Sequence, residues 1–194
     1  MFYDPRAGDT EPAVHRLMPG NAPSAAPESA VPGPPSFDAL LLPEGGDRLK
    51  EIARQVREAS VETRPVRLLG SGLWDVPDLG TEPALVGGWF AAAAPEARQT
   101  FAAHYRATYG HDPPRLASLG YDAAALAVAL VHADGPEPFA QQAILNPNGF
   151  TGVDGLLRFA PSGLVQRGLA VLEVEPQGDV VVSPAPQSFQ DLGY

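Results

Sequence analysis

The sequence contains no cysteine, and Lys50 is the only lysine among its 13 basic residues. Without cysteine the chain cannot form a disulfide scaffold, a thiolate zinc site, an iron–sulfur cluster or a thiol nucleophile. This absence does not decide the redox compartment, because oxidising compartments also hold cysteine-free proteins. The basic residues are outnumbered by 23 acidic ones, and the formal net charge is −10 at pH 7. That charge argues against a nucleic-acid-binding protein, which needs a basic face for phosphate contacts.

Long apolar runs are also missing. A secretory signal has a basic start followed by about 7–15 apolar residues, whereas the chain opens with the polar turn-like segment Met1–Arg6. The longest apolar-rich stretch, 123–131, has the length of a helix and is shorter than a membrane span requires. We therefore expect no targeting segment and no membrane span in this chain. Whether Met1 is the natural start is a separate question.

Proline and glycine are abundant, with 22 and 20 residues, and they gather near the N-terminus. Residues 1–18 predict a short helix, because Thr10 offers an N-cap and Pro12 sits early in the first turn. Residues 19–36 hold many prolines and almost no bulky apolar side chain, which predicts a mobile linker. Elsewhere the chain is apolar enough to bury a core, since 44% of all residues are hydrophobic.

The segment after the linker predicts parallel α/β architecture. Three short apolar runs predict buried strands at Phe37–Leu42, Val66–Gly70 and Leu85–Phe90. Between the first two, Asp47 can cap a helix. Its apolar face is predicted to consist of Leu49, Ile52, Ala53 and Val56. Strands alternating with a helix at this spacing favour a parallel sheet.

The remaining sequence predicts helices first and strands afterwards. Apolar spacing and Gly110 as a stop predict helices at Pro95–Tyr109, Leu116–His132 and Glu137–Leu145. Alternating residues then predict strands at Leu156–Phe159, Leu169–Val174 and Val180–Val182. The last two flank a predicted hairpin turn at Pro176–Asp179.

Motifs for catalysis and cofactor binding are not met. The four histidines have no metal-ligand spacing, and Gly70-Ser71-Gly72 is not the G-x-S-x-G elbow of a serine hydrolase. The pair Gly87-Gly88 belongs to neither a dinucleotide fingerprint nor a P-loop. We therefore expect no enzyme activity, no metal and no cofactor.

Two groups of loop residues allow a functional and a structural interpretation. One group could form an acidic catalytic cluster, although solvated loop charges are the favoured interpretation: Glu44, Asp75, Asp78 and Glu82. The other group is Trp74 and Trp89, which adjoin predicted strand ends, where open α/β sheets place ligand crevices. Packing in the core or over the sheet edge is the alternative for both tryptophans.

As an ordered set, several segments resemble the second half of leucine/isoleucine/valine-binding proteins, which are type I periplasmic binding proteins. The resemblance covers residues 37–175, and no single motif in it would suffice. The segments that carry it are Phe37–Pro43, Val66–Trp74, Leu85–Ala91, Phe101–Gly110, Ser118–Ala123, Gly152–Phe159 and Arg167–Val171. Within that superfamily, the chain looks most similar to penicillin-binding protein activators, which are bacterial lipoproteins.

The resemblance implies a parallel-sheet α/β lobe together with helices of an incomplete second lobe. The implied divisions are 1–18 as a crossing segment and short helix, 19–36 as a linker, 37–92 as an α/β lobe, 93–149 as helices of the incomplete lobe, and 150–194 as return strands and tail. An upstream half of the same protein would supply the rest. Leu119–Leu130 is apolar nearly all round, and we expect its surplus apolar face to need that half.

The implied function is a non-catalytic, periplasmic regulator that activates a penicillin-binding protein in peptidoglycan synthesis, lipid-anchored in its full-length form. The alternative is the substrate-binding component of an ABC transporter for amino acids or a similar small solute. The candidate ligand-binding residues are Glu44, Ser71, Trp74, Asp75 and Tyr121. Amino-acid receptors of this type hold the ligand ammonium with a carboxylate in the loop that here reads Ser71-Gly72-Leu73, with no acid until Asp75.

Overall fold

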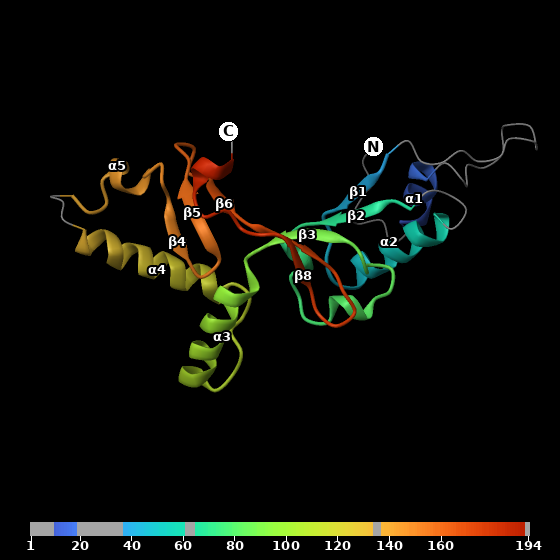
Figure 1. Ribbon diagram of the computed structural model, residues 1–194, viewed down its shortest axis with the longest axis horizontal. Coiled ribbons are helices and arrows are strands. Elements are labelled where there is room, and N and C mark those ends of the chain that lie inside the picture. The colour runs from blue at the N-terminus through green and yellow to red at the C-terminus, as the bar shows by residue number, and fades with distance from the viewer. Residues whose placement is uncertain (1–9, 19–36, 61–64, 134–136, 193–194) are drawn as a thin grey trace, which may run out of the picture. The chain divides into compact units, whose positions relative to one another are not determined.

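The computed structural model describes residues 10–18, 37–60, 65–133 and 137–192 (Figure 1). The predicted linker, 19–36, lies outside these residues. Their helices are α1 (Glu11–Leu17), α2 (Gly46–Ala59), α3 (Pro95–Tyr109), α4 (Ala117–His132) and α5 (Gln141–Ile144), with single 3₁₀ turns η1 (Gly72–Trp74), η2 (Leu79–Thr81) and η3 (Phe189–Leu192). The strands are β1 (Ala39–Leu42), β2 (Arg67–Gly70), β3 (Trp89–Ala92), β4 (Phe150–Gly152), β5 (Gly155–Phe159), β6 (Val165–Gly168), β7 (Ala170–Glu173) and β8 (Val180–Ser183).

The fold is mixed α/β, as predicted, with two sheets. The larger has the strand order β1-β2-β3-β7-β8, and β2 pairs in parallel with both β1 and β3. The smaller, β4-β5-β6, is an antiparallel meander. Of its strands, the sequence predicted β5 alone, as Leu156–Phe159. None of the described helices is long and apolar enough to span a membrane.

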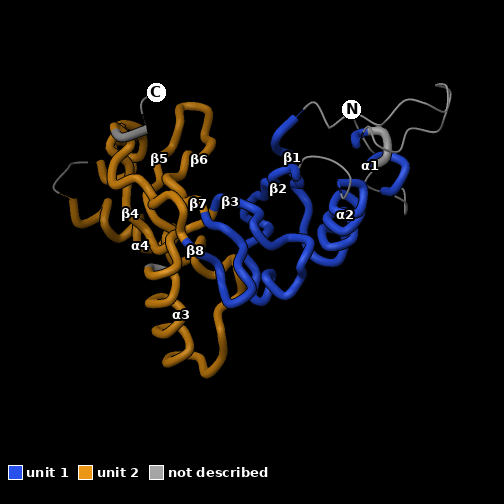
Figure 2. Tube along the Cα trace, turned by 45° about the vertical axis from the view of Figure 1, so that its right-hand side comes forward, with its two compact units in different colours: residues 1–91, 172–180 blue, residues 92–171, 181–194 orange. Residues whose placement is uncertain are grey.

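The chain divides into two compact units, coloured separately in Figure 2. Unit 1 comprises residues 1–91 and 172–180, and unit 2 comprises residues 92–171 and 181–194. The chain therefore passes from one unit to the other at 91–92, 171–172 and 180–181. The finer division predicted from the sequence remains a prediction.

In unit 1, α2 packs through the face that its apolar spacing predicts. Leu49, Ile52, Ala53 and Val56 are all buried. The helix begins two residues earlier than expected, with Gly45 at the N-cap, so Asp47 lies in the first turn and does not cap the helix. There its negative charge interacts favourably with the positive end of the helix dipole.

The short helix α1 forms as predicted and contacts α2. Thr10 occupies the N-cap position, but its hydroxyl makes no cap hydrogen bond and donates to Gln55 Oε1 at 2.9 Å. This contact joins α1 to α2, and the Met18 side chain at the end of α1 is buried.

The third strand begins later than predicted. Residues 85–88 form turns, in which Gly88 N donates to Leu85 O and Gly87 adopts a φ of 78°. That φ lies in the left-handed region that glycine adopts readily. The apolar run therefore starts as a turn, and β3 begins only at Trp89.

Glu82, for which a solvated loop charge is the favoured interpretation from the sequence, is instead a buried structural carboxylate. Its side chain is only 6% exposed and accepts hydrogen bonds from Arg54. The hydrogen bond from Arg54 is the largest cause that lowers the pKa of Glu82. Glu82 therefore ties α2 to the turn that precedes β3.

Replacing Glu82 with glutamine should lower stability at pH 7 and have little effect in acid. A carboxylate whose pKa is lowered by folding stabilises the native state above its ordinary pKa of 4.5, and this stabilisation disappears as the pH falls through the lowered value. Urea midpoints at pH 7, 5 and 3 test this, with E51Q on the exposed side of α2 as the control. Equal midpoints for wild type and E82Q at pH 7 would contradict the proposed role of the pair.

Candidate functional site

The carboxyl ends of β1, β2 and β3 lie at one edge of the larger sheet. Leu42 is opposite Gly70 across β1 and β2, and Gly70 is opposite Phe90 across β2 and β3. The loops that leave the first two strands touch, because a Cβ placed on Gly45 would lie 3.4 Å from Leu73 Cβ. We call this edge, with residues 43–45 and 71–75, the carboxyl edge.

Three of the predicted ligand-binding residues lie on these two loops and are half-buried: Glu44, Ser71 and Asp75. The hydroxyl of Ser71 accepts a hydrogen bond from Leu73 N at 3.4 Å and begins η1. Leu73 next to it is 56% exposed. The carboxyl edge thus offers two carboxylates, a hydroxyl and an apolar side chain within one loop pair.

Trp74, the fourth predicted residue, is a core residue of unit 1. Its side chain is fully buried and its indole N–H donates to Leu42 O at 3.2 Å. The ring lies directly over Gly70, where an added Cβ would come within 2.1 Å of it. Phe90 packs against the same ring, with the centroids 6.2 Å apart. Of the two interpretations offered for Trp74, this burial favours packing in the core. There the indole contacts the ends of β1 and β2, at Leu42 and Gly70.

Trp89 covers the surface of the sheet. Its indole N–H donates to Glu173 Oε2 at 2.7 Å, and the Arg67 guanidinium lies 4.5 Å from its ring centroid. Arg67 also donates to Gly87 O. Trp89 therefore joins three segments of unit 1, and a structural role explains its position.

Asp179 is a further carboxylate near the carboxyl edge that the sequence analysis did not identify. Burial, and secondarily the negative charge of Asp75, raise the pKa of Asp179 above its ordinary value. The turn that carries Asp179 is tightly packed on η2, because a Cβ on Gly80 would lie 2.0 Å from Glu175 O. No local pattern links residues 75 and 179, so only the tertiary fold reveals that they interact.

Tyr121, the fifth predicted residue, lies in unit 2 and is 56% exposed. The centroid of its ring is 5.3 Å from that of Phe101. Along α3, the centroids of Phe101 and Tyr105 are 5.9 Å apart, and those of Tyr105 and Tyr109 are 4.5 Å apart. We call these four rings the aromatic groove. They line a cavity of about 690 Å³ to which His104 and Val153 also contribute.

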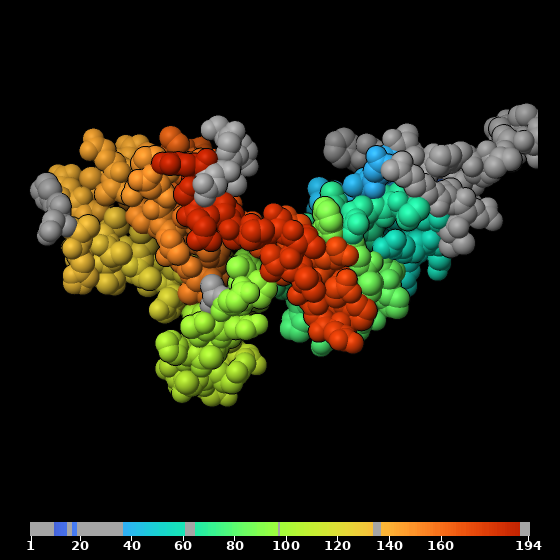
Figure 3. All heavy atoms as spheres, in the orientation of Figure 1, coloured from blue at the N-terminus to red at the C-terminus, as the bar shows by residue number. Residues whose placement is uncertain are grey.

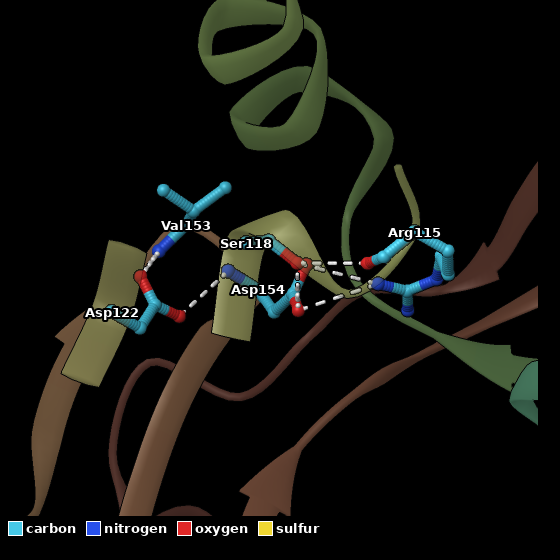
Figure 4. A network of polar contacts seen from close by, with 5 residues as sticks. All are labelled: Arg115, Ser118, Asp122, Val153 and Asp154. Carbon is cyan, nitrogen blue, oxygen red and sulfur yellow. Dashed lines mark hydrogen bonds and ion pairs between the residues drawn. The ribbon is translucent and has the colours of Figure 1, made fainter. Parts of the chain in front are cut away.

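A buried polar network fixes α4 beside the turn between β4 and β5 (Figure 4). Asp122 accepts hydrogen bonds from Val153 N at 2.7 Å and Asp154 N at 3.4 Å. Ser118 Oγ donates to Asp154 Oδ2 at 2.8 Å, and Arg115 Nη1 lies 3.5 Å from the same oxygen. Tyr121 and Val153 line the cavity and are sequence neighbours of Asp122 and Asp154. The network therefore holds both of these lining residues in place.

Two glycines of unit 2 provide a matched test of this packing. A Cβ on Gly152 would lie 2.4 Å from Asp122 Oδ2, whereas a Cβ on Gly120 in α4 would meet nothing within 4 Å. We expect G152A to destabilise unit 2 by about 2–3 kcal/mol, through overpacking and displaced hydrogen bonds. G120A should stabilise it by about 0.5–1 kcal/mol, because alanine favours a helix interior. Urea unfolding of both variants measures the difference, and equal midpoints would contradict the packing described.

Within the described residues, no group of three histidine, aspartate or glutamate side chains could hold a metal ion. The acidic catalytic cluster, which is the less favoured interpretation from the sequence, is likewise divided, since Glu82 pairs with Arg54 while Glu44 and Asp75 lie on the carboxyl edge. The fold therefore gives the acidic residues different environments.

Comparison with known proteins supplies structural relatives. No family model and no curated protein sequence matches the chain significantly. A leucine-binding protein, LivK from Thermotoga maritima, superposes with a TM-score of 0.62 at 20% identity over 96% of this chain and 51% of its own. A putative branched-chain amino acid ABC transporter protein from Rhodospirillum rubrum superposes with a TM-score of 0.62 at 24% identity, over 75% of this chain and 44% of its own. The chain has part of the type I periplasmic binding protein fold.

A third relative is a solute-binding protein of an ABC transporter from R. palustris, crystallised with benzoate. Its TM-score is 0.55 at 17% identity, over 95% of this chain and 49% of its own. The chain thus spans about half the length of these structures. At such identities the likeness concerns the fold, and the ligands named for these structures belong to those proteins.

Proposed function

We propose that the chain is part of a non-catalytic solute receptor that serves an ABC transporter, and that its ligand is a small, amino-acid-like molecule bound at the carboxyl edge of unit 1. The observation that supports this most strongly is the carboxyl edge itself. It places Glu44, Ser71 and Asp75 at the ends of neighbouring parallel strands, where open α/β sheets bind ligands. The structures described above are named as transport components or ligand-binding proteins.

The chemistry of the carboxyl edge favours a ligand with a positive group. Glu44 and Asp75 supply carboxylate acceptors, and Ser71 supplies a hydroxyl. Charge-assisted hydrogen bonds from an ammonium to such carboxylates are stronger than neutral ones. The exposed Leu73 adds an apolar contact beside them. An amino acid, which combines an ammonium with an apolar side chain, suits this arrangement.

The same fold also accommodates the hypothesis of a cell-envelope regulator that activates a penicillin-binding protein. That hypothesis rests on the family resemblance of the sequence, and the transport relatives favour the solute receptor. Periplasmic location is part of the same proposal, whereas a lipid anchor is implied by the resemblance only.

Glutamine at Glu44 and asparagine at Asp75 should each weaken ligand binding about 10- to 100-fold. The physical reason is the loss of a charge-assisted hydrogen bond, worth about 1.5–3 kcal/mol. Binding of the 20 standard amino acids is measured by isothermal titration calorimetry, and the best ligand is compared with its deaminated analogue. E44Q and D75N should weaken binding of the amino acid and leave binding of its deaminated analogue unchanged.

The control for this experiment is E51Q, which removes an exposed carboxylate of α2 away from both loops. It should bind like the wild type. If E44Q and D75N also bind like the wild type, or if the deaminated analogue binds equally well, an ammonium site at the carboxyl edge is excluded.

A further inference from the structure

The turn before β4 in unit 2 carries an asparagine followed by a glycine. Asn148 is exposed, and it is the one asparagine in the sequence that precedes a glycine. In Figure 3 the orange atoms of this part of unit 2 lie at the surface. Asparagine is among the thermolabile residues of proteins, and Gly149 has no side chain to hinder an attack of its main-chain nitrogen on the Asn148 side chain. The pair is therefore open both to water and to chemical modification.

Two hydrogen bonds hold the main chain of this pair in a β-turn over residues 146–149. Gly149 N donates to Asn146 O at 2.9 Å, and Asn148 N donates to Asn146 Oδ1 at 3.0 Å. Pro147 stands at the second position of the turn, where its fixed φ is favourable. Because the N–H of Gly149 is engaged in a hydrogen bond, the turn must open before this nitrogen can attack. Asn146 cannot react by the same route, since the nitrogen of Pro147 carries no hydrogen.

The main chain at Gly149 fits closely between β5 and η3. A Cβ added there would lie 2.4 Å from Leu157 O and 2.6 Å from Phe189 Cε2. The Phe189 side chain is only 6% exposed, and Phe150, which follows the glycine, pairs with Leu157 across β4 and β5. A methylene inserted into the main chain at residue 148 would displace Gly149 from this contact and disturb the packing of Phe189.

We propose that Asn148 is a site of spontaneous conversion to isoaspartate, which the turn delays and which loosens the packing of β4, β5 and η3 once it has formed. Gly149 N loses its proton and bonds to Asn148 Cγ, while the bond from Cγ to the side-chain nitrogen breaks and that nitrogen leaves as ammonia with the proton. Water then opens the imide ring at the main-chain carbonyl of residue 148, so that the chain runs through the side-chain carbonyl and gains a methylene and a negative charge. No group is oxidised or reduced, and the conversion does not depend on the proposed ligand.

Incubation of the purified 194-residue chain in mildly alkaline buffer tests the conversion, because alkali favours loss of the Gly149 proton. Peptide mass spectrometry follows the replacement of NH₂ by OH at each asparagine, and an isoaspartate methyltransferase detects the rearranged product. We expect Asn148 to convert first, and more slowly in the folded chain than in concentrated urea. N146A should speed conversion of the folded chain about 2- to 10-fold, the effect of one hydrogen bond on the opening of the turn, and leave the rate in urea unchanged. N146D keeps an acceptor oxygen and should restore the slower rate.

The structural effect is compared with N148D, which carries the charge of the product without the longer main chain. The isoaspartate form should unfold at a lower urea concentration than both N148D and the wild type. Far-UV circular dichroism verifies that each variant folds, and the comparison of folded with unfolded wild type tests the delay without any substitution. Each of three results would overturn the proposal: conversion that yields aspartate alone, equal rates in the folded and the unfolded wild type, or an isoaspartate form that unfolds together with N148D.

Discussion

Replacing Trp74 with alanine is expected to destabilise unit 1 by about 3–5 kcal/mol, the usual loss for truncating a fully buried aromatic side chain. The indole is 0% exposed, lies over Gly70 and donates its N–H to Leu42 O. Removing it leaves a cavity beneath the carboxyl edge and an unsatisfied carbonyl at the end of β1. Urea unfolding followed by far-UV circular dichroism measures the loss.

The control is the same substitution at Trp89, which is 37% exposed. W89A should lower the free energy of unfolding by clearly less than W74A, because it removes less buried apolar surface. If W74A unfolds at the same urea concentration as W89A, Trp74 does not support the core as described. The ligand-facing interpretation of Trp74 would then regain its strength.

Replacing both Val128 and Val131 with glutamate should weaken self-association and dye binding of the purified chain. Val128 and Val131 of α4 are each more than half exposed, and about 1.5–3 kcal/mol can be gained for each such side chain that becomes fully buried. We expect the wild-type chain to cover these side chains by association, or to bind 8-anilinonaphthalene-1-sulfonate. Two new carboxylates on an already acidic chain should weaken association at least tenfold.

The control is Q99E, which adds a charge at an exposed position of α3. It should associate and bind the dye like the wild type. Light scattering and dye fluorescence at several concentrations measure both properties. A wild-type chain that is a clean monomer without dye binding would show that the 194 residues close their own core, and the interpretation of Val128 and Val131 as an uncovered surface would be wrong.

Local sequence patterns anticipated those parts of the fold that depend on local physics. The spacing of Leu49, Ile52, Ala53 and Val56 defined the buried face of α2, and the short apolar runs predicted parallel strands. The segment Leu119–Leu130 is apolar nearly all round, which predicted that its side chains could not all be covered, and Leu119 is 41% exposed. Leu130, at the end of the segment, is buried.

Tertiary contacts decided the rest. The sequence predicted correctly that Trp74 follows the end of a strand. The direction of its side chain depends on Gly70, which leaves room for the ring, and no periodicity encodes this contact. The late start of β3 follows from the left-handed conformation of Gly87. Asp179 interacts with Asp75 from a distant turn, so local spacing could not include it in the site.

The measurement that tests the central claim most directly is a nuclear magnetic resonance titration of the ¹⁵N-labelled chain with amino acids. It detects weak binding, which matters because the chain spans about half the length of its structural relatives. The account predicts that a ligand shifts the amide signals of residues 43–45 and 71–75, and that E44Q and D75N reduce those shifts. Shifts confined to other segments, or none at millimolar concentrations, would contradict a solute site at the carboxyl edge.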